Sequence, residues 1–306
     1  DQRQGWISGF SPKKGENYPT RGGLRIGKKL PERGLDEFYD QQLEIERDGQ
    51  YYHDLTKWMH ALNLTSRVTG DSKYNKWARE LAQTAHKRFS HQPLFSEQRA
   101  LYSKMRIDLS QSLIPSMGQY DPLDGLITYH QLQVNRAAGT RRSSKLKNEI
   151  SDMNAIYEGR NWETTDALEL GLLLCDAYKT AQLIVNEGLA LDKLLQDLLK
   201  SIETGLESYS KMKLLALPAH YRLAFRELVL SIGLQALGKL ETLVDHHANK
   251  LKGLSPSLIK HLPISKRIED FWLDQMHTEV KSWSDHRDIN MVMLATSLAP
   301  DGFLEL

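Results

Sequence analysis

Five short polar clusters, each at the start of an apolar stretch, hold the side chains most able to do chemistry. They combine carboxylates, imidazoles, guanidinium groups and aromatic rings. Their members are Asp48, Gln50, Tyr51, His53 and Lys57; Gln119, Asp121 and Asp124; Trp162, Glu163, Asp166 and Glu169; His220, Tyr221, Arg222 and Arg226; and Trp283, His286, Asp288 and Asn290. This mixture suits a polyhydroxylated ligand, because rings stack on its apolar faces while carboxylates and amides bind its hydroxyls.

The clusters are compatible with two reactions on a sugar. A glycoside hydrolase uses two carboxylates that flank the scissile bond, one as general acid and one as base. The candidates are Asp48 or Asp124 on one side and Glu163 or Asp166 on the other.

An epimerase or isomerase would instead use two histidines, which remove and return a proton on opposite faces of a carbon. His220 and His286 lie on different predicted helices, as this reaction needs, and Arg222 or Arg226 would stabilise the enolate. The sequence leaves both reactions open.

Helix capping is the competing explanation for the acidic members. Helix N-termini favour Asp and Glu for capping and dipole reasons. Asp121 precedes Pro122 and is therefore expected to be an N-cap, and Asp166 with Glu169 has capping-box spacing. A cation at the positive end of a helix is unfavourable, so the cationic members carry more functional weight. These are His53, His220, Arg222 and His286.

Helical hairpins must position these clusters. Apolar periodicity predicts helix pairs at 48–69 and 71–90, at 121–139 and 142–158, and at 165–186 and 190–211. Further helices are predicted after Pro218, around 266–280 and from Ser284 or Asp285 to Pro300, and LYSKMRIDLS in the 91–118 connection could be a short strand. Apolar helices alternate with amphipathic ones, which is typical of buried and water-facing partners.

The segment TKWMHALNLTSRVTGDSKYNKWARELAQTAHKRF resembles the hairpins of (α/α)-toroid enzymes, namely the six-hairpin glycosidase superfamily and the N-acylglucosamine 2-epimerase group. The resemblance implies an all-α toroid with inner and outer helix rings and few or no strands. It also implies a sugar pocket at the inner-helix N-termini, where the five clusters would meet.

The predicted organisation is a loop arm over residues 1–45, rich in Gly, Pro and charge, followed by a single toroid domain over 46–306. The expected function is a carbohydrate-active enzyme with a small-molecule sugar ligand. The alternative is a non-catalytic toroid or solenoid that binds a protein partner.

The charge, hydropathy and cysteine content of the whole chain limit the kinds of partner that we expect. Lys and Arg number 40 against 39 Asp and Glu, a net charge of +1, so nucleic acid is not expected. No apolar run approaches the roughly 18 residues of a membrane span, and the N-terminus lacks a signal-peptide pattern. The lone Cys175 excludes an internal disulfide, and no metal-ligand or cofactor motif is present. We therefore expect no metal, no cofactor, no membrane and, by default, a cytoplasmic location. A homo-oligomer stays open, as does trimming of an N-terminus that lacks Met.

Overall fold

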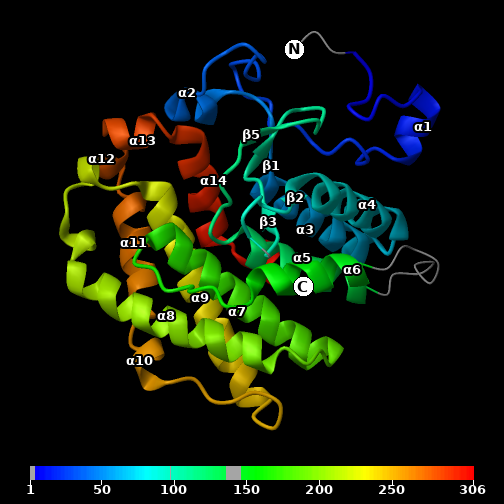
Figure 1. Ribbon diagram of the computed structural model, residues 1–306. Helices are drawn as coiled ribbons and strands as arrows, with labels where there is room; N and C mark the ends of the chain where they lie inside the picture. Colours follow the sequence, from blue (N-terminus) through cyan, green and yellow to red (C-terminus); the bar gives the residue numbers. More distant parts are fainter. Residues whose placement is uncertain (1–3, 97, 136–145) are drawn as a thin grey trace. The chain divides into compact units, whose positions relative to one another are not determined.

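The computed structural model describes residues 4–96, 98–135 and 146–306 (Figure 1). Its contacts divide the chain into two compact units, Asp1–Arg160 (unit 1) and Asn161–Leu306 (unit 2). The described residues are mostly helical with a few short strands, which confirms the all-α class. The predicted division at residue 45 stays a prediction.

The first predicted hairpin of unit 1 is confirmed. Helix α3 (Tyr52–Thr69) ends at Gly70, whose φ of 70° is a left-handed conformation that glycine adopts without a Cβ clash. Asp71 then caps α4 (Ser72–Phe89) by accepting a hydrogen bond from the Lys73 amide at 3.0 Å. The two helices pack against each other.

Two further long helices of unit 1 follow the α3–α4 hairpin in the sequence. Helix α5 (Asp121–Val134) packs on α3, and α6 (Lys147–Tyr157) packs on α5. The predicted end of the first of these at Gly139, and the predicted start of the second at 142, lie outside the described residues.

Short strands precede and follow the α3–α4 hairpin. Strands β1 (Gln50–Tyr51), β4 (Lys104–Met105) and β5 (Ser112–Ile114) form an antiparallel sheet in that order, with Gln50 opposite Met105 and Lys104 opposite Ile114. Strand β2 (Ser90–His91) pairs with β3 (Ala100–Leu101). A strand was expected within LYSKMRIDLS, and β4 lies there.

The predicted arm contains two short helices, α1 (Pro12–Asn17) and α2 (Gln41–Glu46). It is tied to the sheet: the Arg106 guanidinium donates to the Arg33 carbonyl at 2.8 Å, and the Ile107 amide donates to Glu32 at 2.9 Å. The arm is therefore part of unit 1.

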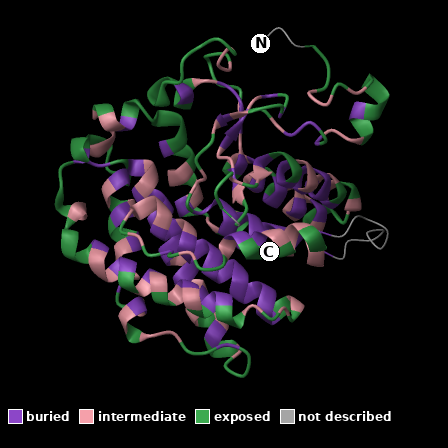
Figure 2. Ribbon diagram, viewed as in Figure 1, coloured by how far each residue is buried: buried purple, intermediate pink, exposed green. Residues whose placement is uncertain are grey.

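In unit 2, α7 (Ala167–Glu187) packs along α9 (Ala224–His246). Glycines permit this close approach, because a Cβ on Gly171 would lie 2.2 Å from the Val229 carbonyl oxygen and one on Gly233 would lie 2.5 Å from that of Gly171. Both helices are buried over most of their length (Figure 2), whereas α8 (Asp192–Met212) buries one leucine-rich face. This agrees with the predicted alternation.

Helices α11 (Pro263–Leu273) and α14 (Arg287–Leu298) also pack on α9. The remaining elements of unit 2 are short: η2 (Leu214–Ala216), η3 (Ala219–Tyr221), α10 (Pro256–Ile259), α12 (Gln275–Thr278), α13 (Lys281–Ser284) and α15 (Asp301–Leu304). None of the described helices combines the length and apolarity needed to cross a membrane.

Candidate functional site

An acidic cluster in unit 1 is the arrangement best suited to proton transfer. Asp121 and Asp124 lie one turn apart at the start of α5, and Thr56 and Lys57 lie on the neighbouring helix α3. The Lys57 ammonium donates to Asp124 Oδ1 at 2.8 Å, and the Thr56 hydroxyl donates to Asp124 Oδ2. The two helices thereby hold one carboxylate in a fixed position beside a positive charge.

Asp121 differs from its neighbour. The residue is 5% exposed, and its Oδ2 makes no hydrogen bond to any described residue. The pKa of Asp121 is raised from 3.8 to about 6, mainly by burial and also by the negative charge of Asp124, while His53, the Gly118 amide and Lys57 oppose the rise. A carboxyl group that titrates close to neutrality, beside a second carboxylate, can give or accept a proton.

The predicted N-cap role of Asp121 is wrong. The residue in the N-cap position of α5 is Tyr120, and no side chain caps this helix. Sequence reasoning undervalued Asp121, because an Asp before a Pro is usually a cap. Its burial, which decides the pKa, depends on tertiary packing.

Aromatic rings lie beside the cluster. The Tyr51 and His53 rings stack with centroids 5.0 Å apart, and the His53 side chain is exposed. The buried Tyr52 hydroxyl donates a hydrogen bond to the Tyr129 hydroxyl at 2.9 Å, and burial raises the pKa of Tyr52 well above its ordinary value. The exposed His53 ring, stacked on the partly buried Tyr51 ring, is available to a ligand.

Asp48 and Gln50 are occupied by the arm. Asp48 accepts from the amides of Gly27 at 2.9 Å and Gly49 at 2.8 Å and pairs with Arg25. Burial raises the pKa of Asp48, but these donors outweigh it and the pKa is lowered. The catalytic role predicted for Asp48 stays a prediction, and its contacts are those of a structural carboxylate.

The Gln50 side chain spans two segments. Its amide donates to the carbonyls of Gly22 at 2.9 Å and Ile107 at 2.6 Å, and its Oε1 accepts from the Leu24 amide at 2.8 Å. The residue is fully buried. It fixes the arm to the turn after β4.

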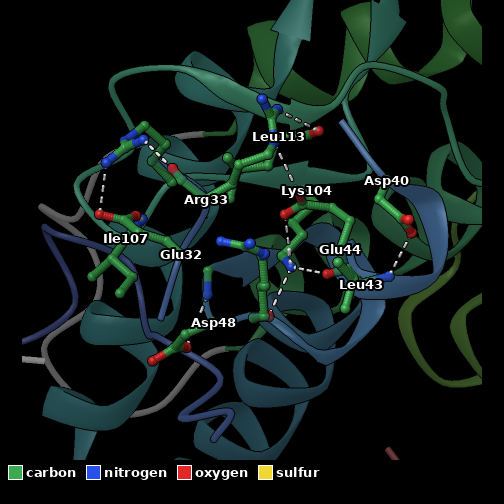
Figure 3. Close-up of polar contacts among 12 residues, drawn as sticks. Glu32, Arg33, Asp40, Leu43, Glu44, Asp48, Lys104, Ile107 and Leu113 are labelled. Carbon is green, nitrogen blue, oxygen red and sulfur yellow. Dashed lines mark hydrogen bonds and ion pairs between the residues drawn. The ribbon is translucent and has the colours of Figure 1, made fainter. Parts of the chain in front are cut away.

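Buried ion pairs add to this attachment (Figure 3). The Lys104 ammonium, fully buried, donates to the carbonyls of Glu44 at 2.5 Å and Arg47 at 2.8 Å, and it lies 3.3 Å from the Glu44 carboxylate. Glu44 also accepts from Arg33 Nε at 2.9 Å. The arm therefore has a defined position against β4.

The predicted capping box of unit 2 is confirmed in part. Asp166 caps α7 by accepting from the Glu169 amide at 3.2 Å. Its Oδ2 also accepts from Arg226 Nη2 at 2.7 Å and from Nε at 3.2 Å. Asp166 therefore caps the helix and also forms an ion pair with Arg226, a second predicted site residue.

Arg222 is buried, and its contacts are those of a residue that stabilises the fold. Its Nε and Nη2 donate to the Glu227 carboxylate at 2.8 and 2.6 Å, and Trp272 Nε1 donates to the same carboxylate at 2.8 Å. The guanidinium carbon lies 3.6 Å from the centroid of the Phe271 ring. Its predicted role in substrate binding stays a prediction.

The fifth cluster is split between buried and exposed members. Trp283 is buried with its ring centroid 5.6 Å from that of Trp272, and Asn290 is fully buried, donating to the Trp283 carbonyl and accepting from the Phe225 amide, both at 2.9 Å. His286 is exposed at the N-cap position of α14, with its ring 5.4 Å from that of Phe225.

Most of the other predicted residues are exposed. His220 is exposed, with its ring centroid 4.0 Å from that of Tyr221, and Trp162 is buried. The remaining three, Gln119, Glu163 and Asp288, have exposed side chains. The structure thus brings together His53, Lys57, Asp121 and Asp124 in unit 1. The predicted partnership of Asp124 with Glu163 stays a prediction.

Comparison of the chain with protein-family models, curated proteins and solved structures gave no significant match. A search of the described residues for three or more His, Cys, Asp or Glu side chains able to hold a metal ion found no such group. The functional interpretation therefore rests on the geometry above.

Proposed function

We propose that the chain is a carbohydrate-active enzyme that hydrolyses a glycosidic bond, with Asp121 as the proton donor and Asp124 as the partner carboxylate. One observation carries the proposal: a buried carboxyl group with a pKa near 6 lies in the first turn of α5, one turn from a carboxylate compensated by Lys57.

The proposed chemistry follows from the difference between the two environments. Asp121 in its protonated form donates its proton to the leaving-group oxygen as the glycosidic bond breaks. Asp124, fixed by Thr56 and Lys57, supplies negative charge to the oxocarbenium-like transition state or activates the water that attacks it. When Asp124 activates the water, it takes a proton from it and then releases that proton to solvent, while Asp121 recovers a proton from solvent.

Two features support a sugar as the substrate. The Tyr51–His53 ring pair lies beside the cluster and offers a stacking surface for a pyranose ring. The cluster lies at the N-terminal ends of α3 and α5, which is where the resemblance to (α/α) toroids implies a sugar pocket. The toroid arrangement of the helices is part of this proposal.

The histidine-based epimerase is less well supported. It needs two imidazoles poised for proton transfer, yet in the described structure His220 and His286 each pack against an aromatic ring and neither contacts a carboxylate. Their exposure leaves them without the fixed orientation that such a reaction requires.

The test is release of reducing ends from a panel of neutral and acidic oligosaccharides. Asp121→Asn should lower kcat by roughly 10²–10⁴-fold with little change in KM, because it removes general-acid catalysis. Asp124→Asn should also reduce kcat, and Asp36→Asn, at an exposed position in the arm, should not. Full activity of Asp121→Asn would reject the assignment, and a wild type inactive on every sugar would favour the partner-binding alternative.

A further inference from the structure

A pocket of unit 1 has no role in the proposed chemistry. It is a pocket of about 780 Å³ formed by the β4–β5 hairpin, the last turn of α4 and the arm. None of its lining residues belongs to the acidic cluster. Its volume is within the range of sites that bind small ligands.

The charge of this pocket has one sign. Lys87 and Arg88 from α4 and Arg33 from the arm line it, and no carboxylate does. Lys87 and Arg88 are exposed, and neither makes a hydrogen bond or ion pair with another residue in the described part of the chain. Arg33 is held in place by Glu44.

Helix-dipole compensation explains part of this charge, since cations are favourable in the last turn of a helix. It does not explain why a third cation, Arg33, comes from the arm to the same pocket, nor why no carboxylate lines the pocket. Three cations around one concavity create a field that attracts an anion.

The rest of the lining suits a ligand with a flat body and hydroxyl groups. The Tyr102 ring is fixed by stacking on His91 at 3.8 Å, and Tyr39 is half-exposed at the rim. The Ser112 hydroxyl is buried and has no hydrogen-bond partner among the described residues. A buried hydroxyl without a partner is costly unless a ligand or water satisfies it.

One residue that lines the pocket, Leu109, has a strained backbone conformation. Leu109 has a φ of 59°, which is unfavourable for a residue with a branched side chain, and a hydrogen bond from the Arg106 amide to the Gln111 carbonyl at 2.9 Å closes the turn around it. Strained conformations of this kind gather at ligand sites, where the surrounding structure maintains them. Leu109 lines the pocket and is buried.

We infer that this pocket binds an acidic saccharide, a sugar unit that carries a carboxylate, with Lys87, Arg88 and Arg33 around the carboxylate and Tyr102 beneath the ring. The saccharide part of this inference rests on the proposed function, and the anionic part rests on the pocket itself.

The test is isothermal titration with cellobiuronic acid, with cellobiose as the neutral match and inorganic phosphate as the bare anion, on the full chain. We expect the acidic disaccharide to bind at least roughly tenfold more tightly than either, with affinity falling as salt rises. Lys87→Ala/Arg88→Ala should weaken it roughly tenfold or more. Lys73→Ala/Lys76→Ala, which removes two cations from the opposite end of α4, should not.

Repeating the titration on Asp121→Asn separates this inference from the proposed function. Unchanged binding there, even without hydrolysis of any sugar by the wild type, supports the pocket and leaves only the catalytic proposal rejected. Four results would each overturn the inference, whatever the hydrolysis assay shows. Cellobiose or phosphate could bind as tightly as cellobiuronic acid, the acid could fail to bind, or Lys87→Ala/Arg88→Ala could bind it as tightly as the wild type does.

Discussion

Replacing Asp121 by asparagine should stabilise the protein at neutral pH but not at acid pH. A carboxyl group whose pKa is raised in the folded state contributes stability below its unfolded pKa, and this contribution is lost as pH rises through the folded pKa. For Asp121 the window runs from 3.8 to about 6. The difference of about two pH units corresponds to about 3 kcal/mol.

Asparagine has nearly the same shape and no charge, so it removes this pH dependence. The free energy of unfolding of Asp121→Asn minus that of the wild type should therefore rise by about 2.5 kcal/mol between pH 4, where a small part of the effect is already present, and pH 7.5. The exposed Asp36→Asn serves as the control and should show a change within about 0.5 kcal/mol.

Urea unfolding at several pH values measures this difference, with hydrogen exchange of α5 amides to identify the transition of unit 1. Comparing variant with wild type at each pH cancels the other titrating groups. A difference that is equal at pH 4 and pH 7.5 would show that the pKa of Asp121 is not raised. It would also remove the physical basis for its role as a proton donor near neutrality.

Three further changes test the packing by the same unfolding measurement. Arg222→Ala should lower the free energy of unfolding by about 3–5 kcal/mol, because it leaves the buried Glu227 carboxylate without its bidentate partner; a loss below 1 kcal/mol would contradict the buried ion pair. Lys104→Met should cost a similar amount, about 3 kcal/mol, since the ammonium joins the arm to β4; an unchanged midpoint would mean that the arm does not depend on it. Gly171→Ala should cost about 1–3 kcal/mol, because its Cβ would overlap a carbonyl oxygen of α9, whereas Gly302→Ala has open space and should be nearly neutral; equal effects of the two would argue against the close α7–α9 contact.

Local signals predicted the helical hairpins well. The apolar spacing from Leu55 to Met59, the Gly70 stop and the Asp71 cap all act within a few residues of the chain. Such interactions are nearly the same in any tertiary context. The structure accordingly has α3, the turn and α4 within a few residues of the predicted bounds.

The sequence by itself determined the all-α class, most helix positions, the buried α7 and the chemical types present in each cluster. Tertiary structure alone decided which of those groups form ion pairs or titrate near neutrality. Asp166 caps a helix as its spacing predicts, whereas Asp121 does not, because burial and a neighbouring carboxylate set its properties. The carboxylate of Asp124 is only three residues away in the sequence, but the burial of Asp121 depends on packing against residues far from it in the chain. The same holds for the basic pocket, whose cations come from α4 and the arm, since charges separated by more than fifty residues meet only when the chain folds.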